Sequence, residues 1–487
     1  MKIRLWLSTA IVVALPAFGG AQTPALDRTA IPTPGPLPQL NVPAWTETML
    51  PNGVKLVVSE KHALPLVSFR LNFVGGTTQF EPADRAGLAD LVTRMMLEGT
   101  TTRSGNRLAT DLQLLGTSLD LSIAQESGVL AFQATSDKFQ PALALAADVL
   151  LHPTFPAPAL ERLRGQALVS LTQMRDRTGG IASMVYPKIL YGAQHPYGRM
   201  TTERTLNAVT RAEVVNFHRA YFQPARAIVT VVGDVNPDSV KIAFEKAFAG
   251  WSAKGSPATF AYPAAPASAA RTIYIVDKPG AEQSTFAIGT VGPPRSTPDY
   301  YAIRVMNEML GVLFQSRLNH NIREEKGYSY GVFSNFAFGR GPGPFMAMGD
   351  IVTAKSDSAL IEFMHELEDI RGKRPPTEDE LAQAKASLVQ SLPASFASVA
   401  GVNRSIASIY LQDLPRDYYQ QFAKAVTAVT GEEVVRVARQ YIDPQHFSIL
   451  IVGDKKRIEA GLVATKIAPI VELNDRGERV NAAAVTP

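Results

Sequence analysis

The sequence predicts an α+β protein of two homologous halves, each a mixed β-sheet packed with helices. Three observations predict this fold class: an internal repeat, blocks of strand pattern that alternate with blocks of helical pattern, and a hydrophobic content of 46% that is enough for buried cores. A chain of 487 residues is too long for one compact core, so two to four domains are expected.

The internal repeat joins residues 208–234 to residues 428–454, which align without a gap. Each copy begins a helix at a threonine, Thr210 or Thr430, with a glutamate three residues later. Both copies continue with Tyr-x-x-Pro and a β-branched strand that ends in Gly-Asp. Because these residues occur in both halves, they are interpreted as part of the fold and not as one active site.

The strand patterns that open each half set the domain boundaries. They lie at residues 54–74 and 272–291, and long helical patterns follow each of them. A stretch of small residues and proline at 252–270 separates the halves and is predicted to be a linker. We therefore predict an N-terminal domain over residues 46–251 and a C-terminal domain over residues 271–487.

The N-terminus has the features of a secretory signal peptide over residues 1–21. Lys2 and Arg4 precede a short apolar stretch, and small residues stand at the expected cleavage site. That stretch is too short to span a bilayer, so we expect cleavage and no membrane span afterwards. Residues 22–45 are predicted to form an extended, proline-rich leader. A periplasmic location is expected, and the absence of cysteine is compatible with it.

Charge and motif content exclude several classes of function. The formal net charge is only +4, without a long basic run, so nucleic acid is not an expected partner. The chain contains no cysteine, G-x-S-x-G motif or phosphate-binding glycine loop. The glycine-rich run at residues 339–343 is interpreted as a flexible loop.

An amphipathic helix is predicted within residues 84–100 from apolar residues at helical spacing. Its context, A-G-L-x-x-x-x-x-x-M-x-x-x-G-T after an N-G-V-K-L-V-V strand, resembles the pitrilysin/insulinase-type metallopeptidases, the inverted zincins. The resemblance covers about residues 46–460 and implies the fold shared by mitochondrial processing peptidase and insulinase.

In active members of that family this helix carries H-x-x-E-H, in which both histidines bind zinc and the glutamate activates water. The matching positions here are Asp90, Thr93 and Arg94. The third family ligand is a glutamate on a later helix, and alignment on Glu161-Arg162 places Ser170 there. An arginine at a ligand position repels a metal cation, so we expect this chain to bind no zinc or other cofactor. Asp90 and Arg94 are expected to form an ion pair instead.

The histidines offer no replacement for this motif. The seven histidines include no H-x-x-x-H pair, and His365-Glu366 begins such a string but has Asp369 at the place of the second histidine. A metal site assembled from distant residues stays open as an alternative.

The second half carries a complementary element. A helix predicted from about Tyr300 runs into the segment Arg323-Glu-Glu-Lys-Gly-Tyr-Ser-Tyr330, where Gly327 suits a helix C-terminal cap. This segment resembles the family's R-E-x-x-G-x-x-Y, whose arginine and tyrosine reach the substrate beside the zinc. The resemblance assigns to Arg323 and Tyr330 donation to a peptide carbonyl and to the oxyanion that develops on it. The alternative is an arginine in a helix-end ion pair and a half-buried strand tyrosine.

The resemblance therefore implies the non-zinc-binding subunit of a heterodimeric periplasmic metallopeptidase for short or unfolded peptides. Its partner would be a paralogue that carries H-x-x-E-H and the zinc, and Arg323 and Tyr330 would act at that partner's site. Whether the chain counts as an enzyme stays open, since activity is expected only in the complex. The alternative is a catalytically inactive pseudopeptidase that binds peptides or serves as a scaffold.

Overall fold

The computed structural model describes residues 40–252, 260–267 and 269–480. The predicted signal peptide and most of the predicted leader lie outside the described residues, as does part of the predicted linker. The described residues belong to one compact unit that contains both halves of the chain.

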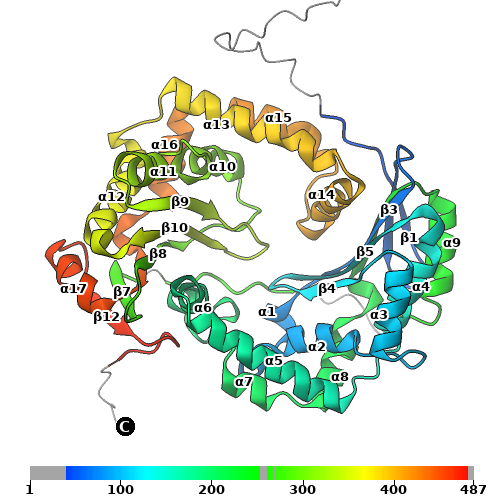
Figure 1. Ribbon diagram of the computed structural model, residues 1–487. Coiled ribbons are helices and arrows are strands. Elements are labelled where there is room, and N and C mark those ends of the chain that lie inside the picture. The colour runs from blue at the N-terminus through cyan, green and yellow to red at the C-terminus, as the bar shows by residue number, and fades with distance from the viewer. Residues whose placement is uncertain (1–39, 253–259, 268, 481–487) are drawn as a thin grey trace, which may run out of the picture. The chain divides into compact units, whose positions relative to one another are not determined.

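The first half contains a six-stranded mixed sheet in the order β1-β2-β6-β3-β5-β4 (Figure 1). Strands β2 and β6 are parallel, and all other neighbours are antiparallel. The strands are β1 Thr46–Met49, β2 Lys55–Glu60, β3 Leu66–Val74, β4 Asp120–Ile123, β5 Ser127–Thr135 and β6 Ala227–Gly233.

The second half repeats the arrangement of the other five strands in a sheet of order β12-β7-β11-β8-β10-β9, whose edge strand β12 is parallel to β7, whereas β1 is antiparallel to β2. Strand β11 lies parallel to β7 and antiparallel to β8, as β6 lies parallel to β2 and antiparallel to β3. The strands are β7 Thr272–Asp277, β8 Gln283–Val291, β9 Ser329–Phe336, β10 Pro344–Val352, β11 Ser448–Gly453 and β12 Ile470–Leu473. The predicted fold class, two halves with a helix-packed mixed sheet in each, is confirmed.

Helices fill the sequence between the strands in both halves. Those of the first half are α1 Thr77–Phe80, α2 Leu88–Met96, α3 Gly105–Leu114, α4 Phe139–Leu151, α5 Ala157–Arg175, α6 Thr178–Tyr191, α7 Glu203–Ala208, α8 Arg211–Tyr221 and α9 Pro237–Ala247. Those of the second half are α10 Tyr300–Asn307, α11 Arg317–Asn319, α12 Ser356–Glu368, α13 Glu378–Ser391, α14 Val399–Leu411, α15 Tyr418–Ala428, α16 Gly431–Tyr441 and α17 Lys455–Ala464. Two π-helical segments, η5 Glu308–Val312 and η6 His320–Glu325, follow α10 and α11.

The repeated segment has the structure that its sequence predicts. Thr210 caps α8 by accepting the backbone N–H of Glu213, whose carboxylate accepts the N–H of Thr210 in return. Thr430 and Glu433 make the same reciprocal pair at the start of α16. Each helix leads into a buried central strand that ends at the predicted glycine.

One predicted helix is wrong in its extent. The helix that begins at Tyr300 does not run on to Arg323, because Leu313 adopts an extended conformation and a new helix begins at Arg317. Gly311 lies so close to Ser334 of β9 that a side chain there would collide with it. The Asn319 amide then donates to the Phe314 carbonyl at 2.7 Å and stabilises the break.

Each half contributes one helix that packs on the sheet of the other half, and we call these helices, α6 and α14, the exchanged helices. Each sheet is covered on one face by helices of its own half. The opposite face of the second sheet contacts α6 of the first half at β8 and β11, and the opposite face of the first sheet contacts α14 of the second half at β3 and β6 (Figure 1). Both exchanged helices contribute apolar residues to small cores of their own.

A buried asparagine fixes the exchanged helix α14 on the first sheet. The side-chain amide of Asn403 is fully buried and donates to the carbonyls of Ser68 (2.7 Å) and Thr230 (3.0 Å). Its oxygen accepts the Thr230 hydroxyl. These bonds satisfy polar groups on both central strands of the sheet, so their loss would leave several polar atoms buried without partners.

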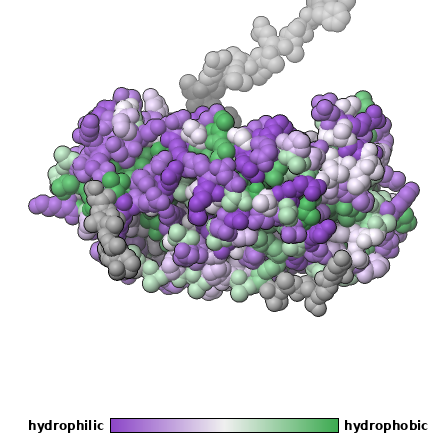
Figure 2. Space-filling model, turned by 90° about the horizontal axis from the view of Figure 1, so that it is seen from below, coloured by the Kyte–Doolittle hydropathy of each residue, from purple (hydrophilic) through white to green (hydrophobic). Residues whose placement is uncertain are grey.

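On the side of the unit that Figure 2 presents, hydrophilic residues predominate and hydrophobic residues are scattered among them. This side has no broad apolar surface. Among the described residues, no helix has both the length and the apolar character needed to cross a bilayer.

We predict that Asn403→Ala lowers the free energy of unfolding by about 2–3 kcal/mol, because it leaves buried groups of β3 and β6 without hydrogen bonds. Urea unfolding followed by circular dichroism measures this. The control is Asn106→Ala, which changes an exposed residue of α3. Equal stability of the two variants would contradict a role of Asn403 in joining the halves.

Candidate functional site

Helix α2 carries three of the four positions at which the resemblance places a zinc site. It runs from Leu88 to Met96, within the predicted segment 84–100, and Gly87 directly before it has a φ of 98°, which suits a glycine. The Glu81 carboxylate accepts the backbone N–H groups of Gly87 (3.0 Å) and Ala89 (2.9 Å) at this helix start. Burial nevertheless raises the pKa of Glu81 to about 7. The helix is therefore firmly placed, with its apolar side in the first core.

The polar side of α2 holds Asp90 and Arg94, two of the three residues at the motif positions. The Arg94 guanidinium lies 3.6 Å from the Asp90 carboxylate, so the predicted ion pair is confirmed. Arg94 also donates to the Gln166 side chain of α5 at 2.7 Å. Thr93 is buried, and its hydroxyl donates to the Asp90 carbonyl at 3.0 Å. The polar side chains of this segment thus bond to one another and to α5.

Ser170 lies on α5 and faces the same hollow as two of the α2 residues. Asp90, Arg94 and Ser170 all line one pocket of about 510 Å³ whose lining comes only from residues 87–206 of the first half. The alignment of Glu161-Arg162 with the family motif therefore leads to a residue that is close in space to the altered α2 motif. Thr93 lies on the same helix but is not part of the pocket lining.

The residues of this pocket do not suit zinc. A zinc site needs three or four neutral imidazole or anionic ligands, whereas this pocket presents one carboxylate already paired with a guanidinium. Within the described part of the chain, no group of three or more His, Asp or Glu side chains is placed to hold a metal ion.

Tyr330 stands at a β-bulge on the edge strand β9. Val332 pairs with Gly349 and Ser329 pairs with Ile351, so Tyr330 and Gly331 together face one residue of β10, Asp350. Ser329 and Val332 are both buried, while the Tyr330 side chain is 88% exposed. A bulge redirects side chains at such points, and here it turns Tyr330 away from the core. The alternative interpretation of Tyr330 as a half-buried strand residue is therefore wrong.

Arg323 lies in the π-helical segment η6 directly before this strand. Its guanidinium is 4.5 Å from the centre of the Phe314 ring, and its Nε is 3.3 Å from the Glu324 carboxylate, so the helix-end ion pair of the alternative interpretation is present. About a third of the side chain is exposed (34%). Gly327 has a φ of 66° and its N–H donates to the Arg323 carbonyl at 3.1 Å, so the predicted helix cap is confirmed. The helix end and the bulge together place Arg323 and Tyr330 at one edge of the second sheet.

The structure does not bring the pocket residues Asp90, Arg94 and Ser170 together with Arg323 and Tyr330. The pocket at Asp90, Arg94 and Ser170 has no lining residue from the second half, and no hydrogen bond or ion pair among the described residues joins it to Arg323 or Tyr330.

Sequence reasoning missed the contact that ties the glycine-rich loop to the first half. The Glu126 carboxylate accepts the backbone N–H groups of Arg340 (2.6 Å) and Gly341 (2.8 Å) and also the Tyr197 hydroxyl. A Cβ at Gly339 would come within 2.6 Å of the same carboxylate. The glycines therefore permit a close approach between backbone and carboxylate. The glycine-rich run signalled this, but nothing in the sequence pointed to Glu126.

Fold and site define a protein with the architecture of a zinc peptidase in which the ligand positions are replaced. Comparison with known families agrees. The insulinase (peptidase family M16) profile matches residues 56–194, and the profile of the peptidase M16 inactive domain matches residues 208–388. These matches cover more than half of the chain, so it belongs to the peptidase M16 (insulinase) family.

Individual relatives are similar at a lower level. An uncharacterized zinc protease of Bacillus subtilis is 24% identical over 285 residues, which cover 58% of this chain and 68% of that protein. A probable mitochondrial-processing peptidase subunit beta of Schizosaccharomyces pombe is 22% identical, with 89% of this chain and 96% of that protein covered. The solved peptidase M16 inactive domain from Pseudomonas fluorescens is 27% identical with a TM-score of 0.77, covering 84% of this chain and 98% of that chain.

The correspondence of the four replaced positions can be tested by restoring ligands. We predict that the variant with Asp90→His, Thr93→Glu, Arg94→His and Ser170→Glu binds zinc, because α2 and α5 bring positions 90, 94 and 170 to one pocket. Zinc retained after dialysis, followed by titration calorimetry, measures this. A matched variant that keeps Ser170 should bind about tenfold or more weakly. A folded fourfold variant that retains no zinc would show that the positions do not converge.

Proposed function

We propose that this chain is the non-zinc-binding subunit of a two-chain periplasmic metallopeptidase. It contributes Arg323 and Tyr330 to the zinc site of a partner paralogue that carries H-x-x-E-H, and the substrates are short or unfolded peptides. The proposal includes export by the N-terminal signal.

The observation that carries this proposal is the exposure of Tyr330. A large side chain that is 88% exposed at a bulge contributes little to folding, and no hydrogen bond of its hydroxyl is found among the described residues. A phenol held in this way is free to meet a group from outside the chain. Because no group of three or more His, Asp or Glu side chains in the described residues is placed to hold a metal ion, we expect the metal site that Tyr330 serves in another chain.

Exposed apolar residues beside Arg323 and on β9 support a partner for the second half. Phe314, whose ring centre lies 4.5 Å from the Arg323 guanidinium, is 61% exposed. Phe333 lies on the face of β9 opposite to the buried Val332 and is 49% exposed. Large apolar side chains that face solvent are candidates for contact with another chain. The word "subunit" in the name of the Schizosaccharomyces pombe relative agrees with a two-chain assembly.

The chemistry of the two residues fits peptide hydrolysis at a partner's metal. A guanidinium is permanently charged and donates in a fixed plane, and a phenol donates one hydrogen bond. Directed at a peptide carbonyl, both groups stabilise the negative charge that develops on its oxygen in the transition state. In this proposal the partner supplies the zinc and its activated water, while this chain orients the peptide and stabilises charge.

We predict that hydrolysis of a quenched, unstructured peptide occurs only when this chain and a candidate H-x-x-E-H chain are mixed in the presence of zinc. Each chain alone should be inactive, because neither holds both the metal and the Arg/Tyr pair. Fluorescence release measures the rate, and a chelator should abolish it. An unchanged hydrolysis rate on mixing the two folded chains would favour the hypothesis of a pseudopeptidase or scaffold protein.

We further predict that Tyr330→Phe lowers kcat of the mixture by about 10²–10³-fold, since a hydrogen bond to the oxyanion is lost. Assembly, measured by sedimentation, should be unchanged because the phenyl ring remains. Tyr328→Phe is the matched control, as this tyrosine is half-buried two residues earlier. Wild-type turnover in Tyr330→Phe would mean that the hydroxyl takes no part in the reaction.

A further inference from the structure

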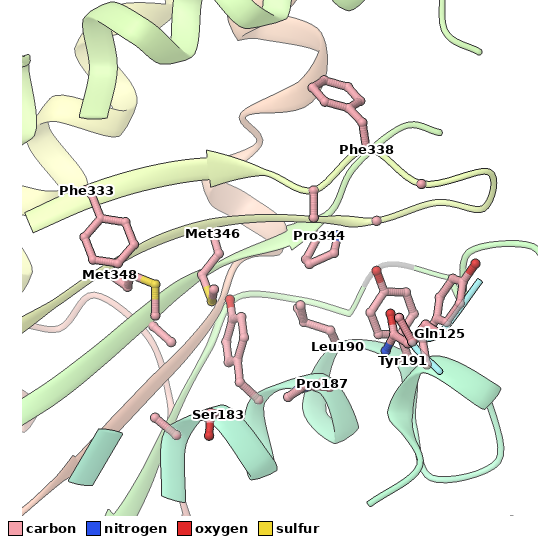
Figure 3. Close-up of a pocket in the computed structure, with 18 of the residues that line it drawn as sticks. Gln125, Ser183, Pro187, Leu190, Tyr191, Phe333, Phe338, Pro344, Met346 and Met348 are labelled. Carbon is pink, nitrogen blue, oxygen red and sulfur yellow. The ribbon is translucent and has the colours of Figure 1, made fainter. Parts of the chain in front are cut away.

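The exchange of α6 leaves a cavity between this helix and the open face of the second sheet. Its volume is about 750 Å³, which is in the usual range for ligand sites. Figure 3 shows Met346, Met348 and Phe333 of the sheet facing Pro187 and Leu190 of α6. The wall is therefore mainly apolar, with flexible methionine side chains that adapt to different apolar shapes.

One end of the cavity is closed and fixed. The loop between β9 and β10 is held there by the Glu126 carboxylate, as described above, and by Tyr191, whose hydroxyl donates to the Pro342 carbonyl at 2.8 Å. Tyr186 in the α6 wall is anchored by a 3.0 Å bond to the Ser448 carbonyl. These contacts hold both walls apart without any ligand, so the cavity is preformed.

The other end of the cavity reaches the bulge at Tyr330. Gly331 and Asp350 both line the cavity, and they are the residues that stand next to and opposite Tyr330. Phe333, two residues beyond Gly331, lies on the same face of β9 and is half-exposed. A peptide held at Tyr330 and extended along β9 would carry its side chains past this opening at about 3.3 Å per residue.

The charges of the lining select between classes of apolar ligand. Glu126 and Asp350 are acidic, and the lining residues include no lysine or arginine in the part of the chain that the structure describes. Glu126 is engaged by three donors, whereas Asp350 is exposed and its carboxylate accepts, among the described residues, only the Thr285 hydroxyl. An acyl chain with a carboxylate is disfavoured in such surroundings, and a cationic group beside Asp350 is favoured.

We propose that this cavity is a specificity subsite that takes a bulky apolar side chain of a peptide with a lysine, arginine or free amino terminus near Asp350. The inference rests on the proposed function, since it assumes that the peptide lies at Arg323 and Tyr330. It adds a substrate class to that function: unstructured peptides in which a large apolar residue stands within a few residues of a positive charge.

The test is equilibrium binding of fluorescein-labelled peptides to the full chain without any partner, measured by anisotropy at low salt. The parent peptide is a flexible Gly/Ser sequence with one phenylalanine and one lysine. Replacing its phenylalanine by alanine should weaken binding about tenfold or more, because a buried aromatic side chain is lost. Replacing its lysine by glutamate should weaken binding several-fold.

Two variants assign these effects to the cavity. Phe333→Ser should remove most of the discrimination between phenylalanine and alanine peptides. Asp350→Asn should remove the discrimination between lysine and glutamate peptides and leave the other ratio unchanged. Leu114→Ser, at an exposed residue of α3 outside the cavity, is the control and should change neither ratio.

The outcomes separate the subsite from the proposed function. No binding, unchanged ratios in Phe333→Ser and Asp350→Asn, or displacement of the peptide by dodecanoate at lower concentration than by the free peptide would overturn the subsite. Binding with the expected ratios but no hydrolysis on mixing with the zinc-bearing chain would support the subsite and overturn the shared active site. Hydrolysis by the mixture without a preference for phenylalanine peptides would support the shared active site and overturn the subsite.

Discussion

The exchange of α6 and α14 is the constraint on which the rest of the structure depends. A mixed sheet with helices on one side leaves its other face apolar, and here each half covers that face with a helix from the other half. The halves cannot separate without exposing both faces and breaking the buried bonds of Asn403. The position of every group on the second sheet relative to α6 follows from this exchange, including the cavity and the loop held by Glu126.

Stability and the replaced metal site are largely separate in this design. The apolar residues of α2 are fully buried and hold the helix in the first core, whereas Asp90 and Arg94 lie on its polar side with 65% and 35% of their side chains exposed. An exposed ion pair of this kind contributes about 0–1 kcal/mol. The helix therefore folds for reasons unrelated to metal binding. The packing of α2 therefore does not depend on the two exposed residues Asp90 and Arg94.

Local signals in the sequence predicted the elements but not the way in which they meet. The repeat predicted two equivalent halves, and the Thr210 and Thr430 caps are present because they depend on residues three positions apart. The packing of α6 and α14 on the opposite half's sheet was not predicted, since the apolar pattern of a helix does not specify which sheet it covers. The break at Leu313 was missed because it arises from the close approach of Gly311 to β9, a contact between residues far apart in sequence.

The bulge shows why the candidate site needed the structure. By simple alternation, Tyr330 shares a face with Val332, which is buried, so a regular strand would turn the phenol towards the core. One extra residue opposite Asp350 interrupts this alternation, so that Tyr330 is exposed while the next residue, Gly331, lines the cavity with Phe333. Strand β9 is also the last strand of its sheet, so its outer edge has no neighbouring strand among the described residues. Strand β9 therefore carries an exposed phenol, one wall of an apolar cavity and a free edge, and the segment η6 with Arg323 directly precedes it, which is an arrangement that suits an added peptide strand.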